Sequence, residues 1–286
     1  MKTKLKLAIQ KSGRLTEKSL QLLSECGISI SNGSRSLIAS AQSFPLEVLF
    51  LRDDDIPEYV ENGVADIGIL GQNVVLEKEK SVQEIRQLGF AKCRLSLAVR
   101  RENNYTNISD LNGKKIATTY PKILAQYLAE NGVNAEIETI SGSVEIAPSI
   151  GLADAVCDIV STGSTLLMNG LKEVEKVISS EAVLIANDSL SQEKQELLNR
   201  LLFRIDAVKT AKNNKYILLN APNDKLEILS NLLPGMDSPT IMPLAKEGWS
   251  SLHSVVPENQ FWEIIDELKA NGAQGILVTP IEKMIV

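Results

Sequence analysis

A loop of small hydroxyl residues around one glycine is the part of the chain whose residue types best suit chemistry. It follows an apolar segment over residues 155–160 that we expect to be a strand, and a leucine-led, helix-forming segment comes next. The members of the loop are Ser161, Thr162, Gly163, Ser164 and Thr165. Backbone N–H groups and hydroxyls at a helix start donate to anions, and glycine permits close approach. The loop predicts a phosphate site, with an ordinary capped strand-to-helix turn as the alternative.

Two cations follow the first expected strand, which spans residues 5–9. The residues after it are Lys11, Ser12, Gly13 and Arg14. Thr16 is then expected to cap a helix over 17–26 that Gly27 ends. A small-residue turn with two cations at the carboxyl end of a strand suits an anionic ligand, and a solvated loop is the alternative.

Composition narrows the classes of protein. The net charge is −6 without a long basic run, so we expect no nucleic-acid partner. No apolar stretch approaches the roughly 20 residues that span a bilayer, and the N-terminus is expected to be a strand rather than a signal peptide. Three distant cysteines, Cys26, Cys93 and Cys157, fit neither a disulfide framework nor a zinc site, and indicate a reducing cytoplasm. The single histidine, His253, is expected to be a half-exposed strand residue, so catalysis is expected to do without histidine.

A repeated order of elements predicts two related α/β halves. Residues 115–119 are expected to form a strand, followed by a helix that Pro121 opens and Asn131-Gly132 ends. An aspartate with a glycine five residues later occurs in one strand of each half, as Asp66 with Gly71 and Asp158 with Gly163. We expect the halves to aim loops from strand ends at a shared cleft.

A third unit follows a long charged helix over Gln192–Lys212. Its expected elements alternate in the order βαββαβ, which is typical of a ferredoxin-like sandwich. They are a strand over 216–220, a helix over 224–233 that Pro234-Gly235 ends, strands over 241–245 and 249–256, a helix over 258–270 and a strand over 276–279.

Nearly the whole chain resembles the long form of the ATP phosphoribosyltransferase family. The run from Glu145 through Leu166 is similar to the family's motif, and further matching segments follow one another in the family's order. These segments are 10–15, 52–57, 65–71, 93–97, 116–121, 131–132, 233–235 and 238–240. The resemblance implies a two-lobed α/β core like that of periplasmic binding proteins. Its lobes would be residues 1–95 with 182–211, and 96–181, and a ferredoxin-like regulatory domain would occupy 212–286.

The resemblance also implies the reaction that opens histidine biosynthesis. N1 of the ATP adenine attacks C1 of phosphoribosyl pyrophosphate and expels pyrophosphate, which gives N1-phosphoribosyl-ATP. Because N1 of a neutral adenine carries no proton, its attack needs no strong base, and catalysis rests on positioning and preorganised donors. Mg²⁺ is the implied cofactor, held mainly by substrate oxygens and water, and its protein ligands are left open.

Implied roles fall first on the two loops described above. The loop 161–165 holds the 5′-phosphate of the donor, and Ser12 and Gly13 belong to the substrate site. Asp158 either reaches a ribose hydroxyl or pins the loop. The catalytic set that the resemblance implies is Lys11, Arg14, Arg94 and Glu145.

Four further residues receive roles from the resemblance, and for three of them the sequence also allows a purely structural role. Glu145 is either the family's leading acidic residue or a helix-start carboxylate. Asp54 lies at the cleft near ribose or metal, or its acidic run caps a helix. Arg94, a lone arginine among apolar residues, faces pyrophosphate or forms a structural ion pair. Tyr120 is expected to line the nucleotide site.

The third unit is implied to bind histidine as an allosteric inhibitor. The candidate residues are Ser238, Thr240, Ala273 and Gly275, which offer small, polar turn chemistry between neighbouring subunits of a dimer-built hexamer. Two other functions stay open at this point. One is a solute-binding or amino-acid-sensing module, because two lobes around a cleft also serve solute receptors. The other is a transferase that acts on a different nucleobase.

Overall fold

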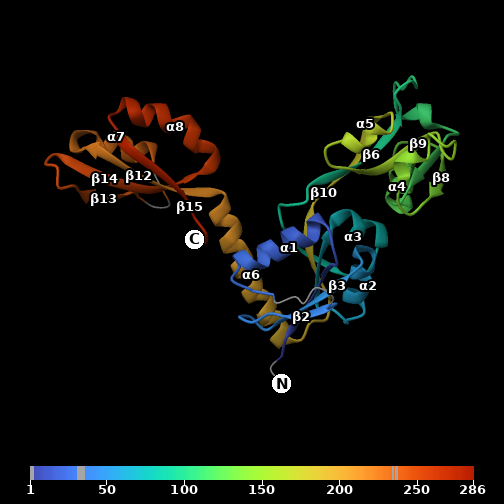
Figure 1. Cartoon of the computed structure of the whole chain (residues 1–286), viewed down its shortest axis with the longest axis horizontal. Coiled ribbons are helices and arrows are strands. Elements are labelled where there is room, and N and C mark those ends of the chain that lie inside the picture. The colour runs from blue at the N-terminus through green and yellow to red at the C-terminus, as the bar shows by residue number, and fades with distance from the viewer. Residues whose placement is uncertain (1–2, 31–35, 234, 236–237) are drawn as a thin grey trace. The chain divides into compact units, whose positions relative to one another are not determined.

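The computed structural model describes residues 3–30, 36–233, 235 and 238–286, so Pro234 of the expected helix end lies outside the described residues. Contacts divide the chain into a larger unit, residues 1–21 with 28–197, and a smaller one, residues 22–27 with 198–286. Figure 1 labels the elements of both. Among the described residues, no helix is long and apolar enough to cross a membrane.

The first sheet of the larger unit has six strands in the order β2-β3-β1-β4-β11-β5. Strands β3, β1 and β4 run parallel, so their carboxyl ends meet at one edge, and β11 closes antiparallel on β4. The strands are β1 (Leu5–Gln10), β2 (Ile38–Ser40), β3 (Leu46–Leu51), β4 (Ile67–Gly71), β5 (Gln83–Gln87) and β11 (Ala182–Ala186). The helices are α1 (Arg14–Glu25), α2 (Ile56–Glu61) and α3 (Gln72–Lys78), with a 3₁₀ turn η1 over Asp53–Asp55.

The second sheet has five strands in the order β10-β6-β9-β7-β8. Strands β8, β7 and β9 run parallel, and β6 and β10 add antiparallel to β9. The strands are β6 (Cys93–Arg100), β7 (Lys115–Thr118), β8 (Glu136–Thr139), β9 (Ala155–Val160) and β10 (Leu171–Ser180). The helices are α4 (Pro121–Glu130) and α5 (Ser164–Met168), with 3₁₀ turns η2 (Ile108–Leu111) and η3 (Val144–Ile146). Alternation along β9 gives each face of the sheet its own apolar cluster.

The two lobes repeat one arrangement, but the expected alignment of their aspartates was wrong. Asp66 precedes β4, and its carboxylate accepts a hydrogen bond from the N–H of Lys6 on the neighbouring strand at 2.8 Å. Asp154 precedes β9 and accepts from the N–H of Lys115 in the same way at 2.9 Å. Asp154, rather than Asp158, is therefore the counterpart of Asp66, because each carboxylate clamps the start of a parallel pair.

The first helix also begins earlier than expected. It starts at Arg14, and Thr16 lies inside it, where the hydroxyl donates to the carbonyl of Gln10 at 2.8 Å instead of capping the helix. Gly13 has φ +104°, a left-handed conformation that glycine adopts without strain and that turns the chain from β1 into α1. The turn therefore leads directly from the end of β1 to Arg14, the first residue of α1.

The smaller unit contains α6 (Gln192–Lys212) from Leu198 onward, and the bounds of this helix agree with the sequence prediction. Its antiparallel sheet has the order β13-β14-β12-β15 and is covered by two helices, which confirms the βαββαβ order. The elements are β12 (Asn214–Pro222), a 3₁₀ turn η4 (Asn223–Lys225), α7 (Leu226–Leu232), β13 (Thr240–Pro243), β14 (Trp249–Pro257), α8 (Glu258–Ala270) and β15 (Gln274–Pro280). His253 is a half-buried residue of β14, as expected, and its ring contacts Tyr216 and Ser251.

Buried polar contacts join the two lobes inside the larger unit. The side-chain amide of Asn73 on α3 donates to the hydroxyl of Tyr120 at 3.1 Å, and its carbonyl accepts from Ser180 at 2.8 Å. Glu77, also on α3 and buried, accepts from the backbone N–H groups of Lys122 and Ile123 at 3.1 Å each. A carboxylate from one lobe thus caps the first turn of α4 in the other.

We predict that Glu77→Ala lowers the free energy of unfolding by about 2 kcal/mol, because two buried N–H donors lose a charged acceptor. Glu79→Ala is the matched control, since Glu79 forms only an exposed ion pair with Lys122 and should change stability by less than about 0.5 kcal/mol. Urea unfolding of both variants measures the difference. Equal losses would show that Glu77 does not cap α4.

Candidate active site

A hollow of about 340 Å³ brings the candidate phosphate loop together with residues from elsewhere in the larger unit. Arg14 comes from the start of α1, Glu145 from η3 and Asp158 from β9. The remaining lining is the run 159–166, which contains the whole loop. Parallel strands explain the meeting, because the loops that follow β1 and β9 leave the carboxyl ends of their sheets.

The loop itself has the conformation of an open turn into a helix. Gly163 has φ +81° and directly precedes α5, and a Cβ at this position would meet nothing nearer than Val160 at 3.9 Å. The hydroxyls of Thr162 and Ser164 lie 3.0 Å apart, so they support each other at the mouth of the turn. Gly163 is therefore required by its backbone angle and leaves room for a ligand above the turn.

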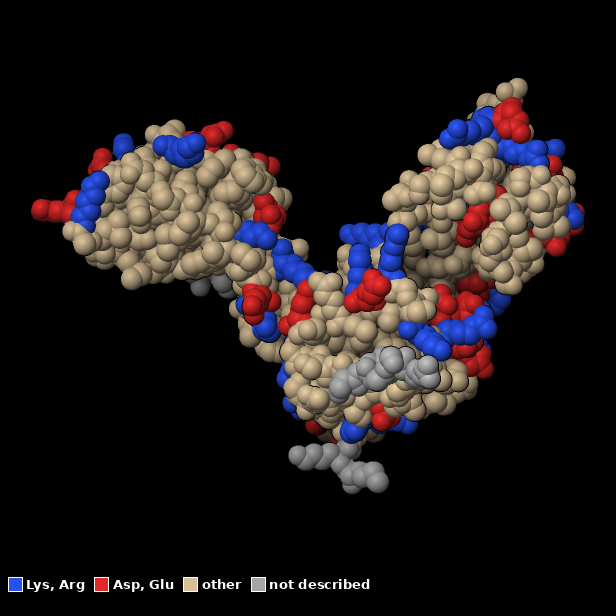
Figure 2. All heavy atoms as spheres, in the orientation of Figure 1, with Lys and Arg blue, Asp and Glu red and all other residues tan. Residues whose placement is uncertain are grey.

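The cations at the end of β1 are available to a ligand. Lys11 and Arg14 are exposed, and within the described ranges neither side chain has a hydrogen-bond or ion-pair partner. The positive end of the helix dipole repels a cation at the first position of a helix, so α1 does not stabilise the charge of Arg14. On the face that Figure 2 displays, blue side chains occur in small groups, some with red side chains close by. Of the two cations after β1, Arg14 lines the hollow.

Arg52 is a further cation that the sequence analysis did not single out. It follows β3 directly, and β3 pairs with β1, whose next residue Lys11 donates its N–H to the carbonyl of Leu51 at 2.7 Å. Arg52 is exposed and has no side-chain partner among the described residues. Its position after a parallel strand, like that of Lys11, was the signal that could have identified it.

Asp158 and Glu145 place two carboxylates on the hollow. Burial raises the pKa of Asp158, the N–H of Ile159 partly offsets this by donating to the carboxylate at 2.8 Å, and the charge of Glu145 raises it further. Glu145 stands in the first turn of η3, as its structural alternative required, and it also lines the hollow. The two carboxylates can accept hydrogen bonds from ribose hydroxyls, and their oxygens are ligands of the kind that Mg²⁺ prefers.

Asp54 and Tyr120 are held by neighbours. Asp54 belongs to η1 and forms an ion pair with Lys78 at 3.5 Å, and none of the three aspartates of η1 makes a side-chain cap to the next helix. Burial raises the pKa of Tyr120, and the charges of Asp158 and Asp53 add to the shift. Since the hydroxyl oxygen of Tyr120 accepts from Asn73, its proton remains free to donate.

Arg94 is paired with residues of its own lobe at a partly exposed position. Its guanidinium contacts both carboxylate oxygens of Glu173 on β10 at 2.5 Å, and one nitrogen donates to the carbonyl of Ser161 at 3.3 Å. Of the two roles expected from the sequence, the structural ion pair is the one that these contacts favour. Glu173 was missed, because nothing in the sequence indicates which acidic residue of β10 would face Arg94.

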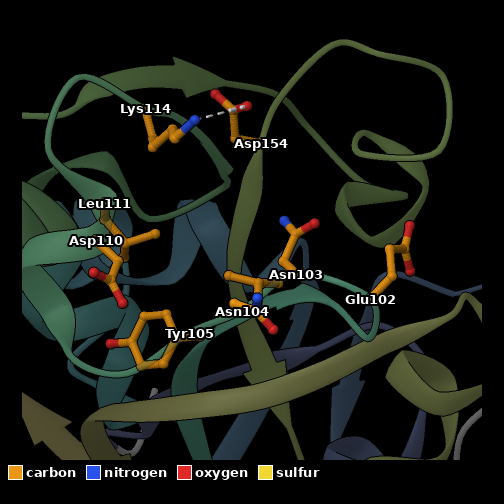
Figure 3. Close-up of a pocket in the computed structure, with 9 residues that line it drawn as sticks. Glu102, Asn103, Asn104, Tyr105, Asp110, Leu111, Lys114 and Asp154 are labelled. Atoms are coloured by element: carbon orange, nitrogen blue, oxygen red, sulfur yellow. Dashed lines mark ion pairs between the residues drawn. The ribbon is translucent and has the colours of Figure 1, made fainter.

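A second hollow, of about 450 Å³, lies at the opposite end of the same sheet (Figure 3). It is polar, and its one lysine, Lys114, pairs with Asp154 at 4.0 Å. Register places it away from the loop, since Val99 of its lining pairs with Ala155 whereas Arg94 pairs with Val160. Although larger, this hollow lacks free cations among its described lining residues, so the smaller hollow at the loop is the better candidate.

The candidate allosteric residues do not form one pocket within a single copy of the smaller unit. Thr240 lies on edge strand β13, whereas Gly275 lies on β15 at the other edge, with two strands between them. Ser238 and Thr240 are exposed, but Ala273 is buried in the apolar cluster and can offer a ligand only its backbone.

Fold and hollow together define a two-lobed α/β protein whose hollow is suited to a phosphorylated ligand. Residues 52–207 match the family model described as ATP phosphoribosyltransferase, and residues 211–283 match the HisG, C-terminal domain. The chain is 60% identical over 285 residues, all of both proteins, to an ATP phosphoribosyltransferase of Cytophaga hutchinsonii. The chain therefore belongs to the ATP phosphoribosyltransferase family, in the form that carries the C-terminal domain. The expected activity, the first step of histidine biosynthesis, is confirmed.

Solved structures agree with this assignment. The ATP phosphoribosyl transferase (HisG:HisZ) complex from Thermotoga maritima matches with a TM-score of 0.61 and 32% identity, over 71% of this chain and 96% of that one. A histidine kinase sensor domain with similarity to periplasmic binding proteins matches with a TM-score of 0.50 and 13% identity, over 72% of this chain and 90% of that one. The second likeness concerns the fold alone and confirms the expected two-lobed core.

We predict that Asp158→Asn raises the melting temperature at pH 7 while it weakens donor binding. A raised carboxyl pKa in the folded state means that ionisation destabilises the fold, so the favourable contribution of Asp158 is present below the unfolded pKa of about 3.9 and is lost as pH rises through the folded value. The advantage of Asn should therefore vanish in acid. Thermal melts across pH 3–8 measure it.

Asp110→Asn provides the contrasting variant. The pKa of Asp110 is lowered because its carboxylate accepts from the N–H groups of Thr106 and Asn107, so its loss should destabilise the protein at neutral pH. If Asp158→Asn also lowered the melting temperature at pH 7, Asp158 would be a residue that pins the loop.

Proposed function

We propose that the hollow at the loop is where phosphoribosyl transfer takes place. The loop 161–165 holds the 5′-phosphate of phosphoribosyl pyrophosphate, and Arg14 stabilises the negative charge that develops on the departing pyrophosphate. The observation that carries this proposal is that one hollow is lined both by the loop and by Arg14, whose side chain has no partner among the described residues. Lys11, Ser12 and Gly13 complete the donor site on the side of β1.

The acceptor site in this proposal lies beside Tyr120. Adenine N1 attacks C1 of the ribosyl donor with its lone pair as the bond to pyrophosphate breaks, so no protein base has to remove a proton. The free proton of the Tyr120 hydroxyl is available to hydrogen-bond the nucleotide, while Asn73 fixes the direction of that hydroxyl. The rate then depends on how well the two reactants are aligned. Such alignment can lower the activation barrier by up to about 7–11 kcal/mol.

Mg²⁺ is proposed as the cofactor that neutralises the two polyanions. Among the described residues, no cluster of three or more histidine, cysteine or acidic side chains is suited to a metal. Glu145 and Asp158 supply two hard oxygen donors, which fits an ion carried mainly by substrate oxygens and water. Asp54 is already paired with Lys78, so we propose that it does not contact the ion directly.

The three cysteines all lie in the described part of the chain and form no disulfide, which suits the reducing cytoplasm that we propose as the compartment of the protein.

The test measures pyrophosphate release by the purified chain with donor, Mg²⁺ and one acceptor at a time. The acceptors are ATP, adenine and orotate. We expect release with ATP alone among the three.

We also predict that Gly163→Val weakens donor binding at least about tenfold, because a branched residue at φ +81° must distort the loop. Calorimetry with the donor measures the affinity.

Gly113→Val is the control for Gly163→Val. Gly113 has φ +69° with open space around it and lies in the same lobe, outside the lining of the hollow, so it carries a similar backbone cost without a ligand. Circular dichroism confirms that both variants fold. Equal donor affinity in the two variants would show that the loop is not part of the donor site.

We further propose that residues 212–286 form a regulatory domain that binds histidine between subunits of a homo-oligomer, a hexamer built from dimers. The separation of Thr240 and Gly275 on opposite edges of one sheet supports a site that two copies complete. Bound histidine would favour an arrangement in which the hollow is less competent, with a coupling of roughly 1–3 kcal/mol.

We predict that Thr240→Arg abolishes inhibition by histidine without changing the uninhibited rate. Thr240 is exposed on an edge strand, so the longer side chain fills the space between copies rather than the core. Gln260→Arg, at an exposed position of α8, is the charge-matched control and should leave inhibition intact. Undiminished inhibition of the Thr240 variant would move the histidine site elsewhere.

A further inference from the structure

We propose that Arg94 is a positioning residue for the phosphate loop and that Glu173 holds it in place. The proposal rests on the function proposed above, because it concerns how the donor's phosphate site is kept in shape. It replaces the expectation that Arg94 itself faces pyrophosphate. Glu173, which no earlier step of the sequence analysis identified, becomes part of the donor site without touching the donor.

The contacts form a chain across three neighbouring strands. Ser161, the first loop residue, offers its carbonyl to Arg94 at 3.3 Å. Arg94 on β6 then reaches both oxygens of Glu173 on β10 at 2.5 Å, and Ser96 donates its hydroxyl to the same carboxylate at 2.8 Å. Arg94 and Ser96 lie two residues apart on β6 and so face the same side of the sheet.

A local irregularity of the sheet helps Glu173 to meet this group. The pairing of β10 with β6 shifts register between Glu173 and Glu175, so the strand bends at this place. Ser96 lies opposite Asp158 of β9, and Arg94 lies opposite Val160. The same face of the sheet therefore carries the Arg94–Glu173 pair beside the strand that leads into the loop.

The charge of Arg94 is already neutralised, which disfavours a direct role at pyrophosphate. Hydrogen bonding to Arg94 lowers the pKa of Glu173, and the carboxylate raises the pKa of Arg94, so both groups stay charged and paired. Among the described residues that line the hollow, Ser161 is present and Arg94 is not. Arg14, in contrast, lines the hollow without a partner in the described chain.

Holding one carbonyl has a direct consequence for the loop. The peptide bond between Ser161 and Thr162 is planar and trans, so its C=O and N–H point in opposite directions. When Arg94 fixes the carbonyl of Ser161, it also fixes the direction of the Thr162 N–H, one of the donors at the mouth of the loop. Release of the carbonyl lets this peptide rotate, which removes a preorganised donor.

The test compares Arg94→Ala, Glu173→Gln and the double variant by steady-state kinetics and by donor calorimetry. If Arg94 positions the loop, the donor KM rises about tenfold in Arg94→Ala, the size expected for losing one charge-assisted hydrogen bond. Glu173→Gln raises the donor KM in the same direction, the KM for ATP stays within about twofold, and the double variant is no worse than Arg94→Ala.

Glu136→Gln is the control, since Glu136 pairs with Lys115 at 2.9 Å on the same sheet away from the loop. A fall in kcat for Arg94→Ala together with unchanged kinetics for Glu173→Gln would overturn the proposal in favour of a catalytic cation. Unchanged donor affinity in both variants would overturn it as well. Should the wild-type chain release no pyrophosphate, the proposed function fails, whereas donor calorimetry still decides whether the pair supports the loop.

Discussion

Two polyanionic substrates must be brought together on a protein whose own net charge is −6. Backbone N–H groups solve part of this problem, because they attract phosphate without adding a side-chain charge. Parallel strands solve another part, because they deliver the loop and the cations after β1 to the carboxyl ends of their sheets. In the proposed site, the loop 161–165 and Arg14 together meet this constraint on charge.

Some cationic side chains of the larger unit have no ion-pair partner among the described residues, and others are paired with carboxylates. Lys11, Arg14 and Arg52 are exposed and unpaired within the described residues, so they keep their charge for a ligand. Arg94 and Lys78 are instead paired with the carboxylates of Glu173 and Asp54. The contacts of Asn73 and Glu77 join the two lobes, and Arg14 and the loop line one hollow of the same unit.

Much of this could be predicted from the sequence, because the signals are local. The bounds of α6 and α8, the strand before the loop and the βαββαβ order follow from periodicity, proline and glycine. Long-range contacts could not be predicted in this way. The Asp66–Asp154 correspondence depends on strand register, and the contact of Arg94 with Glu173 joins β6 to β10 next to a register shift. The start of α1 was misplaced because the hydroxyl of Thr16 bonds to Gln10 rather than to its own helix.

A structure of the chain crystallised with phosphoribosyl pyrophosphate and Mg²⁺ tests the central claim most directly. The account predicts the 5′-phosphate within hydrogen-bond distance of the backbone N–H groups of the loop 161–165, with pyrophosphate directed toward Arg14. It also predicts that Arg94 stays on Glu173 and Ser161. A donor bound in the reverse sense, with pyrophosphate in the loop, would contradict the account, as would a donor in the hollow beside Lys114.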